Sequence, residues 1–136
     1  LGLGFQTGGL NDREIFRIQS AVISRIAEES SAVFVGRASD YVLRGRTDCV
    51  DVFVCAPDVC RRERVSHRMG ISCEEAGKLI LKKDKGREDY YNFFTFGHWG
   101  VASNYDLCVD SSILGTDATA DFIIDFAVRS GKLSNR

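Results

Sequence analysis

The sequence predicts an α/β fold built on a parallel sheet, and three observations support this class. Short apolar runs, rich in β-branched and aromatic residues, alternate with longer segments of helical periodicity. The length of 136 residues suits a single domain with an ordinary hydrophobic core. Hydrophobic residues make up 44% and charged residues 27% of the chain, a composition that is typical of globular domains and excludes a disordered or fibrous protein.

The first predicted element is a helix over about residues 12–29, which follows a glycine-rich loop at residues 1–10. Asn11 begins the sequence N-D-R-E, in which Asn11 and Glu14 have the spacing of a capping box. Apolar residues then recur at helical spacing, at Ile15, Ile18, Val22 and Ile26. The local signals for a helix and for its start therefore agree.

Three short apolar runs are predicted to be strands, at residues 32–36, 50–55 and 105–110. Each run is apolar along its length, as strands are when a parallel sheet is covered on both faces. Three strands cannot all lie in the interior of a sheet. The pattern therefore implies further neighbouring strands, supplied either by upstream chain or by a partner subunit in a homo-oligomer.

Helices are predicted between and after these strands. A short helix lies within residues 37–43, and another covers about residues 58–68 before Gly70 ends it. Thr116 or Asp117 is predicted to cap a last helix. This alternation predicts that the strands are parallel and joined by right-handed crossovers.

A further helix begins at a second capping box, formed by Ser72 and Glu75. It reaches a dense aromatic cluster of Tyr90, Tyr91, Phe93 and Phe94. Aromatic residues at this density more often pack in a core or at a subunit contact than stack on nucleic-acid bases. We therefore expect the cluster to be structural.

The net charge of −1 conceals a basic segment between Arg61 and Arg87. This segment contains nine Lys or Arg against four Asp or Glu, a local charge of +5, so the remainder carries −6. A basic segment in a near-neutral protein favours a local anionic ligand over general coating of nucleic acid. A solvated helix face remains the alternative explanation from charge alone.

The five cysteines are expected to be free thiols. Their number is odd and no two form a C-x-x-C pair, which argues against a disulfide framework and for a reducing cytoplasm. Their spacing to the histidines fits no zinc pattern, so we expect no metal site. No apolar run approaches the ~20 residues that span a bilayer, so we expect no membrane partner.

Ligands of doubly wound sheets bind beyond the carboxyl ends of the strands. Gly36 and Arg37 follow the first predicted strand. Glycine at such a position lets the backbone approach a ligand, and the guanidinium offers a planar fork for a phosphate. An ion pair between Arg37 and Asp40 is the alternative.

Cations also recur at a spacing of four residues on the two basic helices. Arg64 and Arg68 form one pair, and Lys83 and Arg87 form another. Facing cations on two helices can clamp a polyphosphate and neutralise the charge that develops during phosphoryl transfer. The alternative is solubility together with helical ion pairs, such as Glu75 with Lys78.

Several of these segments resemble the cytidylate kinase-like family of P-loop nucleoside monophosphate kinases. The resemblance runs from about Asn11 to the last helix. It is carried by the segments AVFVGRASDYVL (32–43), DVFVCAP (51–57), KKDKGREDYYN (82–92), WG (99–100) and YDLC (105–108). The combination of G-R-x-x-D-Y-x-L with D-K-x-R-x-x-Y-Y is more specific than either element alone.

The resemblance implies a three-layer parallel sheet of the P-loop kinase type and transfer of the ATP γ-phosphoryl group to a nucleotide, with Mg²⁺. Gly36, Arg37 and Asp40 would then bind the acceptor nucleotide. Residues 58–95 would form a basic helical lid over the ATP phosphates. Within it, Lys83 and Arg87 would be the catalytic, phosphate-contacting cations, Asp84 would hold their geometry, and the remaining lid arginines would be Arg61, Arg64 and Arg68.

Two departures from the family pattern limit what the resemblance implies. Val35 and Ala38 replace both aspartates of the family's D-G-R-D element, which leaves cytosine recognition open. The family's phosphate loop, with its lysine, lies on a strand between the first two strands named above, and residues 1–136 contain no such loop. We therefore expect one incomplete domain that does not transfer phosphate by itself.

The replaced aspartates also support an alternative function. A non-catalytic nucleotide-binding or interaction module could keep this fold without the kinase reaction. Binding of nucleic acid through the basic helices is a third hypothesis, and the near-neutral charge of the chain argues against it.

Overall fold

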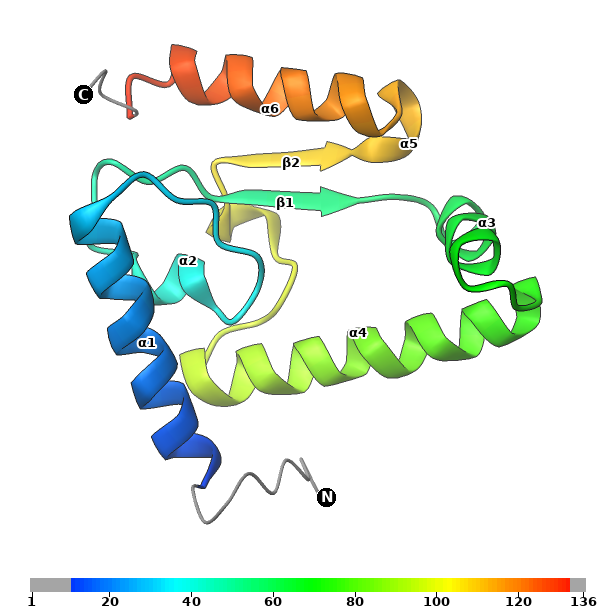
Figure 1. The fold of residues 1–136 in the computed structure, drawn as a ribbon, viewed down its shortest axis with the longest axis horizontal. Helices are drawn as coiled ribbons and strands as arrows, with labels where there is room; N and C mark the ends of the chain where they lie inside the picture. Colours follow the sequence, from blue (N-terminus) through cyan, green and yellow to red (C-terminus); the bar gives the residue numbers. More distant parts are fainter. Residues whose placement is uncertain (1–10, 133–136) are drawn as a thin grey trace.

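The computed structural model describes residues 11–132 (Figure 1). The elements follow in the order α1 (Asp12–Glu29), α2 (Ser39–Val42), β1 (Val52–Cys55), α3 (Asp58–Met69), α4 (Cys73–Thr95), the 3₁₀ turn η1 (Ala102–Asn104), β2 (Leu107–Asp110), α5 (Ser111–Leu114) and α6 (Thr116–Arg129).

Strands β1 and β2 form a parallel pair. Val52 lies opposite Leu107 and Cys55 lies opposite Asp110. The chain between these strands forms α3 and α4, so the pair has the crossover connection that parallel strands require. The prediction of an α/β fold with a parallel sheet is therefore confirmed, and within the described residues the sheet has two strands.

The prediction of a strand at residues 32–36 is wrong for the described part of the chain. Residues 31–35 adopt no regular structure, and the side chains of Val33 and Val35 are 92% and 91% exposed. A strand needs a hydrogen-bonded neighbour, and no described strand lies beside this segment.

The strands are also less buried than the sequence predicts. Val54, Cys55 and Cys108 are exposed, although strands covered on both faces should bury such side chains. The paired strands have no further described neighbour. Part of their apolar surface is therefore left uncovered by the described residues.

The helix boundaries follow their local signals. Both predicted capping boxes are formed, at Asn11 with Glu14 and at Ser72 with Glu75. In each, the side chain of the N-cap residue accepts the backbone N–H of the glutamate, and the glutamate side chain accepts the backbone N–H of the N-cap residue. Gly70 ends α3 with a φ of 65°, a left-handed conformation that glycine adopts without strain. The last helix begins at Thr116 and its N-cap is Gly115, so the prediction that Thr116 or Asp117 caps it is wrong, and both residues lie in its first turn.

Helix α4 connects the two ends of the molecule. Its first half packs against α3, and its second half reaches α1 (Figure 1). At that end Phe16 of α1 stacks on Phe94 at 4.3 Å between ring centroids, and Tyr90 meets Phe94 edge-on at 4.8 Å. The predicted structural role of the aromatic cluster is thus confirmed for these residues.

The described residues show no membrane-spanning or metal-binding element. No described helix has both the length and the apolar composition needed to cross a bilayer. All five cysteines are free thiols. Among the described residues, no three His, Cys, Asp or Glu side chains gather in a way that could hold a metal ion.

Candidate functional site

One face of α4 is directed into the molecule along its whole length. Ala76, Ile80, Tyr91 and Thr95 are buried at helical spacing on this face. Asp84 has the same spacing, since it lies four residues after Ile80 and seven before Tyr91. Residues of this face can therefore meet groups from α3 and from the loop before α2.

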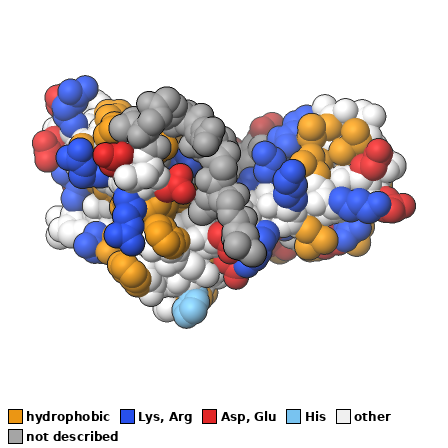
Figure 2. Space-filling model, turned by 90° about the horizontal axis from the view of Figure 1, so that it is seen from below, with side chains coloured by type: hydrophobic (Ala, Val, Ile, Leu, Met, Phe, Trp, Pro, Cys, Tyr) orange, Lys and Arg blue, Asp and Glu red, His pale blue; other side chains and the backbone are white. Residues whose placement is uncertain are grey.

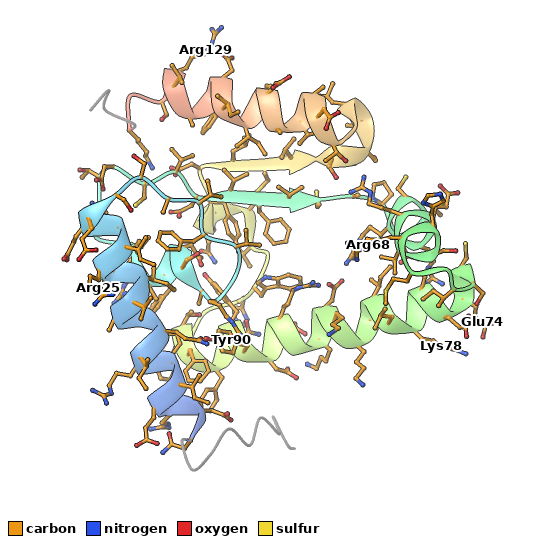
Figure 3. The ribbon with its side chains drawn as sticks, viewed as in Figure 1. Arg25, Arg68, Glu74, Lys78, Tyr90 and Arg129 are labelled. Carbon is orange, nitrogen blue, oxygen red and sulfur yellow. The ribbon has the colours of Figure 1, made fainter. Side chains whose placement is uncertain are left out.

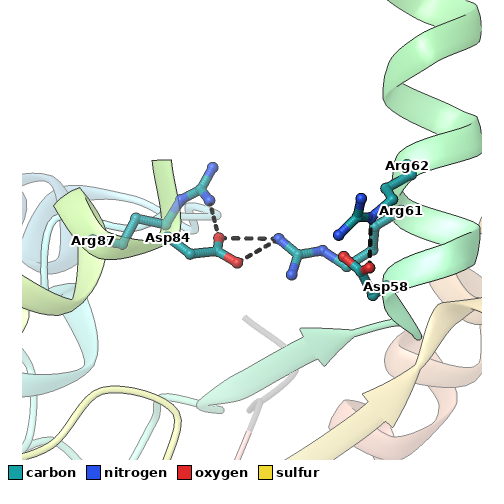
Figure 4. Close-up of polar contacts among 5 residues, drawn as sticks. All are labelled: Asp58, Arg61, Arg62, Asp84 and Arg87. Carbon is teal, nitrogen blue, oxygen red and sulfur yellow. Dashed lines mark hydrogen bonds and ion pairs between the residues drawn. The ribbon is translucent and has the colours of Figure 1, made fainter. Parts of the chain in front are cut away.

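Asp84 joins two arginines into one network (Figure 4). Its carboxylate accepts from Arg61 of α3, with a shortest distance of 2.8 Å, and from Arg87 of α4 at 2.7 Å. The side chain of Asp84 is 23% exposed and those of Arg61 and Arg87 are 35% and 57% exposed. This partial burial lets one carboxylate fix two guanidinium groups that still reach solvent.

The other three cations of the predicted lid are not joined by ion pairs to described residues. Arg64, Arg68 and Lys83 are exposed and form no ion pair with any described residue. Figure 3 shows Arg68 on α3, at the opposite end of α4 from Tyr90. Figure 2 shows lysine and arginine side chains spread over the face that includes the α3–α4 end.

Two other ion pairs of the hairpin are ordinary i,i+4 helical pairs. Lys78 pairs with Glu74 at 2.7 Å and not with Glu75, because Glu75 is engaged with the backbone and hydroxyl of Ser72 in the capping box. That engagement lowers the pKa of Glu75. Arg62 lies against Gly77 of α4 and pairs with Asp58.

Residues 36–40, called here the 36–40 loop, comprise the turn before α2 and the first two residues of that helix, and the turn has an unusual backbone. Gly36, Arg37 and Ala38 have φ values of 73°, 58° and 51°. Left-handed conformations cost glycine little, but they are strained for arginine and alanine. Ala38 is only 4% exposed, so packing contributes to holding this conformation.

Two tyrosines of α4 contact the 36–40 loop. The guanidinium of Arg37 lies over the ring of Tyr90, 5.4 Å from its centroid. The hydroxyl of Tyr91 donates to Oδ2 of Asp40 at 2.7 Å. The alternative ion pair between Arg37 and Asp40 is not formed.

The environment of Tyr91 keeps its hydroxyl protonated. Burial first, and then the hydrogen bond to Asp40, raise the pKa of Tyr91 far above its usual range. The phenol therefore remains a hydrogen-bond donor at every physiological pH. Burial likewise raises the pKa of Tyr90, against the opposing effect of Arg37.

The Asp84 network and the 36–40 loop are thus linked by one helix. Asp84 and Tyr91 are separated by seven residues, or about 10 Å along the helix axis. The structure places the predicted residues Arg61, Asp84, Arg87, Arg37 and Asp40 around this stretch of α4. The two tyrosines were not predicted as site residues, although their helical spacing from Asp84 and Arg87 was available in the sequence.

The fold and the site together define an α/β protein in which a helical hairpin carries arginines past the carboxyl end of a parallel strand. A more specific assignment comes from comparison with known proteins. The chain belongs to the cytidylate kinase-like family, whose model matches residues 3–113. The resemblance stated from the sequence is therefore confirmed.

Individual relatives agree with this family. A cytidylate kinase of Methanopyrus kandleri is 32% identical over 105 residues, which cover 68% of this chain and 52% of that protein. A cytidylate kinase of Pyrococcus abyssi is 32% identical over 106 residues, which cover 74% of this chain and 52% of that protein. The chain spans about half the length of these curated relatives.

A solved structure shares the architecture. The crystal structure of an uncharacterized protein from Eubacterium ventriosum matches with a TM-score of 0.82 and 27% identity. The match covers 89% of this chain and 69% of that one. The arrangement of helices around the parallel pair thus recurs in another protein.

Proposed function

We propose that this chain forms part of an ATP-dependent nucleoside monophosphate kinase, which transfers the ATP γ-phosphoryl group to the phosphate of a nucleotide. The observation that carries the proposal is the inward face of α4. This face holds Asp84 with its two arginines and, two turns later, the link from Tyr91 to Asp40. Membership of the cytidylate kinase-like family supports the class of reaction.

In this proposal the 36–40 loop binds the acceptor nucleotide, with Gly36 allowing close approach and Arg37 binding its phosphate. Residues 58–95 act as a lid over the ATP phosphates. Lys83 and Arg87 contact the transferred phosphoryl group and Asp84 aligns Arg87. The further lid cations are Arg61, Arg64 and Arg68. Catalysis then consists of positioning and charge neutralisation without a covalent intermediate.

The residues described fit a phosphate better than a metal ion. Exposed guanidinium and ammonium groups lie on α3 and α4, while no described cluster of carboxylates could hold Mg²⁺. Magnesium bound to ATP supplies charge neutralisation in phosphoryl transfer generally. We assign no residue of this chain to the ion, and the cofactor that we assign to the lid is ATP.

We further propose that a strand carrying a phosphate loop lies between residues 31–35 and β1 in the functional protein, as in a three-layer P-loop fold. Two observations support it. Val33 and Val35 are exposed at 92% and 91% on a segment without regular structure or a described partner strand. The matched relatives are also about twice as long as the part that this chain covers.

We infer that residues 1–136 belong to one domain and that the protein acts in the cytoplasm. The free thiols of all five cysteines fit a reducing compartment. A nucleotide is then the expected partner.

A non-catalytic nucleotide-binding module is the second candidate. It is favoured by Ala38, which is buried and left-handed at a position where the D-G-R-D element of the family has an aspartate. Such a module would bind nucleotide through the 36–40 loop without transferring phosphate.

A coupled ATP assay on the intact gene product tests the proposal with CMP, dCMP, UMP and AMP as acceptors. We expect turnover with at least one acceptor, and Arg87→Ala should lower kcat about 100-fold because a charge that stabilises the transition state is lost. The control is Arg129→Ala, which removes an exposed arginine of α6 that pairs with Asp125. Nucleotide binding without turnover would favour the non-catalytic module. Absence of both turnover and calorimetric ATP binding would contradict the proposal.

A further inference from the structure

Asp40 is held by a residue that lies 51 positions away in the sequence. Oδ2 of Asp40 accepts the hydroxyl of Tyr91 at 2.7 Å. No ion pair joins Asp40 to any described residue, and no described donor other than Tyr91 is bonded to it. One carboxylate oxygen is therefore engaged by α4, and the other has no donor among the described residues.

The position of Tyr91 makes this contact rigid. Tyr91 is 8% exposed, and Thr95, one turn later on the same face of α4, is buried as well. A buried aromatic ring loses little further freedom when its hydroxyl is engaged. The hydroxyl of Tyr91 therefore sets the orientation of the Asp40 carboxylate.

The 36–40 loop needs such support because its backbone is strained. Arg37 and Ala38 adopt positive φ, which costs roughly 1–3 kcal/mol for each residue outside glycine. Surrounding contacts must hold the conformation. Tyr90 contacts Arg37 itself, and Tyr91 contacts Asp40, two residues after the strained pair.

We propose that Tyr91 is a positioning residue, which fixes Asp40 so that its free oxygen accepts an O–H or N–H group of the acceptor nucleotide. This inference rests on the proposed function. It assigns α4 two tasks, since the helix that carries Asp84 and Arg87 also fixes the geometry of the 36–40 loop. The ligand group is a sugar hydroxyl or an exocyclic amino group, because both are donors that a carboxylate accepts.

The test uses Tyr91→Phe in the intact protein. This variant keeps the buried ring and removes only the hydroxyl. We expect the KM of the acceptor to rise about three- to tenfold, as for loss of one typical intramolecular hydrogen bond. The kcat and the KM for ATP should stay within twofold, because neither the lid nor the transferred group is touched.

Tyr41→Phe is the matched control. Tyr41 lies next to Asp40 and its ring contacts Arg44, but its hydroxyl forms no hydrogen bond with any described residue. Its removal should change neither KM. An equal rise in acceptor KM in both variants would overturn the specific role of Tyr91.

Three acceptors identify the ligand group. A Tyr91→Phe penalty with CMP that disappears with dCMP assigns the contact to the 2′-hydroxyl. A penalty that disappears with UMP assigns it to the amino group of cytosine. A penalty common to all three supports positioning of the loop as a whole, and no penalty with any of them overturns the inference.

A second readout separates this inference from the proposed function. Hydrogen exchange of the backbone amides of residues 38–43 should become about three- to tenfold faster in Tyr91→Phe than in Tyr41→Phe. If the unsubstituted protein neither binds nor converts any nucleotide, the proposed function fails and hydrogen exchange alone decides the role of Tyr91. Unchanged exchange would then overturn the inference independently.

Discussion

Asp51 is partly buried near two other carboxylates, those of Asp106 and Asp40. Burial first, followed by repulsion from Asp106 and Asp40, raises the pKa of Asp51, and Lys132 offsets only part of this effect. A carboxyl whose pKa is raised on folding favours the protonated form in the folded state. Stability is therefore lost as the pH rises from the unfolded pKa, near 3.9, through the folded pKa.

Asp51→Asn should consequently stabilise the protein at neutral pH. The amide keeps the shape of the side chain and removes the charge that is repelled. Thermal unfolding at pH 7 should show a higher Tm than the unsubstituted protein, and the difference should shrink as the pH falls toward 4.

Asp121→Asn is the matched control for Asp51→Asn, because it removes an exposed carboxylate of α6. The control should leave Tm nearly unchanged at both pH values. A Tm for Asp51→Asn that is lower than that of the unsubstituted protein at pH 7 would contradict the expected repulsion.

The pKa of Asp106 is shifted in the opposite direction from that of Asp51. The backbone N–H of Asp51 and the ammonium group of Lys132 lower the pKa of Asp106. Its contribution to stability is present above the unfolded pKa and is lost as the pH falls through the folded value. The two neighbouring aspartates therefore have opposite effects on stability, and only Asp51 is expected to be a stabilising site for substitution.

At the scale of the elements, the hairpin of α3 and α4 depends on a glycine. A Cβ atom at Gly77 would lie 2.6 Å from Cζ of Arg62, so the guanidinium would have to move. Arg62 pairs with Asp58 through Nε, and its displacement would disturb this pair and the packing of the hairpin. Gly86, in the same helix, has open space around its Cβ position.

These two glycines form a matched pair of tests. Gly86→Ala should raise the free energy of unfolding by about 0.5–1 kcal/mol through helix propensity. Gly77→Ala should show no such gain in urea unfolding, because the displaced guanidinium offsets it. In an Arg62→Ala background, Gly77→Ala should become stabilising. Equal gains for the two single variants would show that Arg62 does not restrict Gly77.

The Asp84 network provides a second test of the hairpin. Asp84→Ala leaves Arg61 and Arg87 without their shared partner. We expect the free energy of unfolding to fall by about 1 kcal/mol, a modest value because these ion pairs are partly exposed to solvent. Asp89→Ala is the control, since it breaks an exposed helical pair with Lys85 that is worth about 0.2–0.5 kcal/mol. A loss for Asp84→Ala no greater than that for Asp89→Ala would show that the network adds nothing to stability.

The elements also show which parts of the fold local sequence could predict. The start of α1 was predicted correctly because Asn11 and Glu14 are close in sequence and satisfy each other. The strand at 32–36 was predicted wrongly, because a strand depends on neighbours outside its own sequence. Lys78 was assigned to Glu75, although Glu75 is engaged at the start of its helix.

The site was predictable to a similar extent. Motif spacing and the family resemblance predict Arg37, Asp40, Asp84 and Arg87 as site residues, and their roles stay predictions. Their contacts were not predicted, because Tyr91 meets Asp40 across 51 positions of sequence and no local rule pairs such residues. The joining of Arg61 to Asp84 likewise depends on how α3 packs against α4, a feature of tertiary structure.

At the scale of the whole molecule, the described residues leave apolar side chains exposed on residues 31–35, a segment without regular structure. Val33 and Val35 project into solvent, while the predicted strand pattern requires them to be covered. The proposed neighbouring strand would cover them in the functional protein. In the 136-residue chain alone, by contrast, an exposed position should tolerate a polar residue.

Val33→Asp distinguishes these two situations. In the 136-residue chain we expect a change in the free energy of unfolding below about 0.5 kcal/mol, as for most surface substitutions. In the intact gene product, where the proposed strand packs on residues 31–35, the loss should exceed about 2 kcal/mol, because a charge replaces a buried side chain. Ile23→Ala, at a position that is 8% exposed, should instead be destabilising in both proteins. Urea unfolding of the four variants therefore tests the strand directly, and an equally small loss for Val33→Asp in both proteins would remove the physical basis for placing it there.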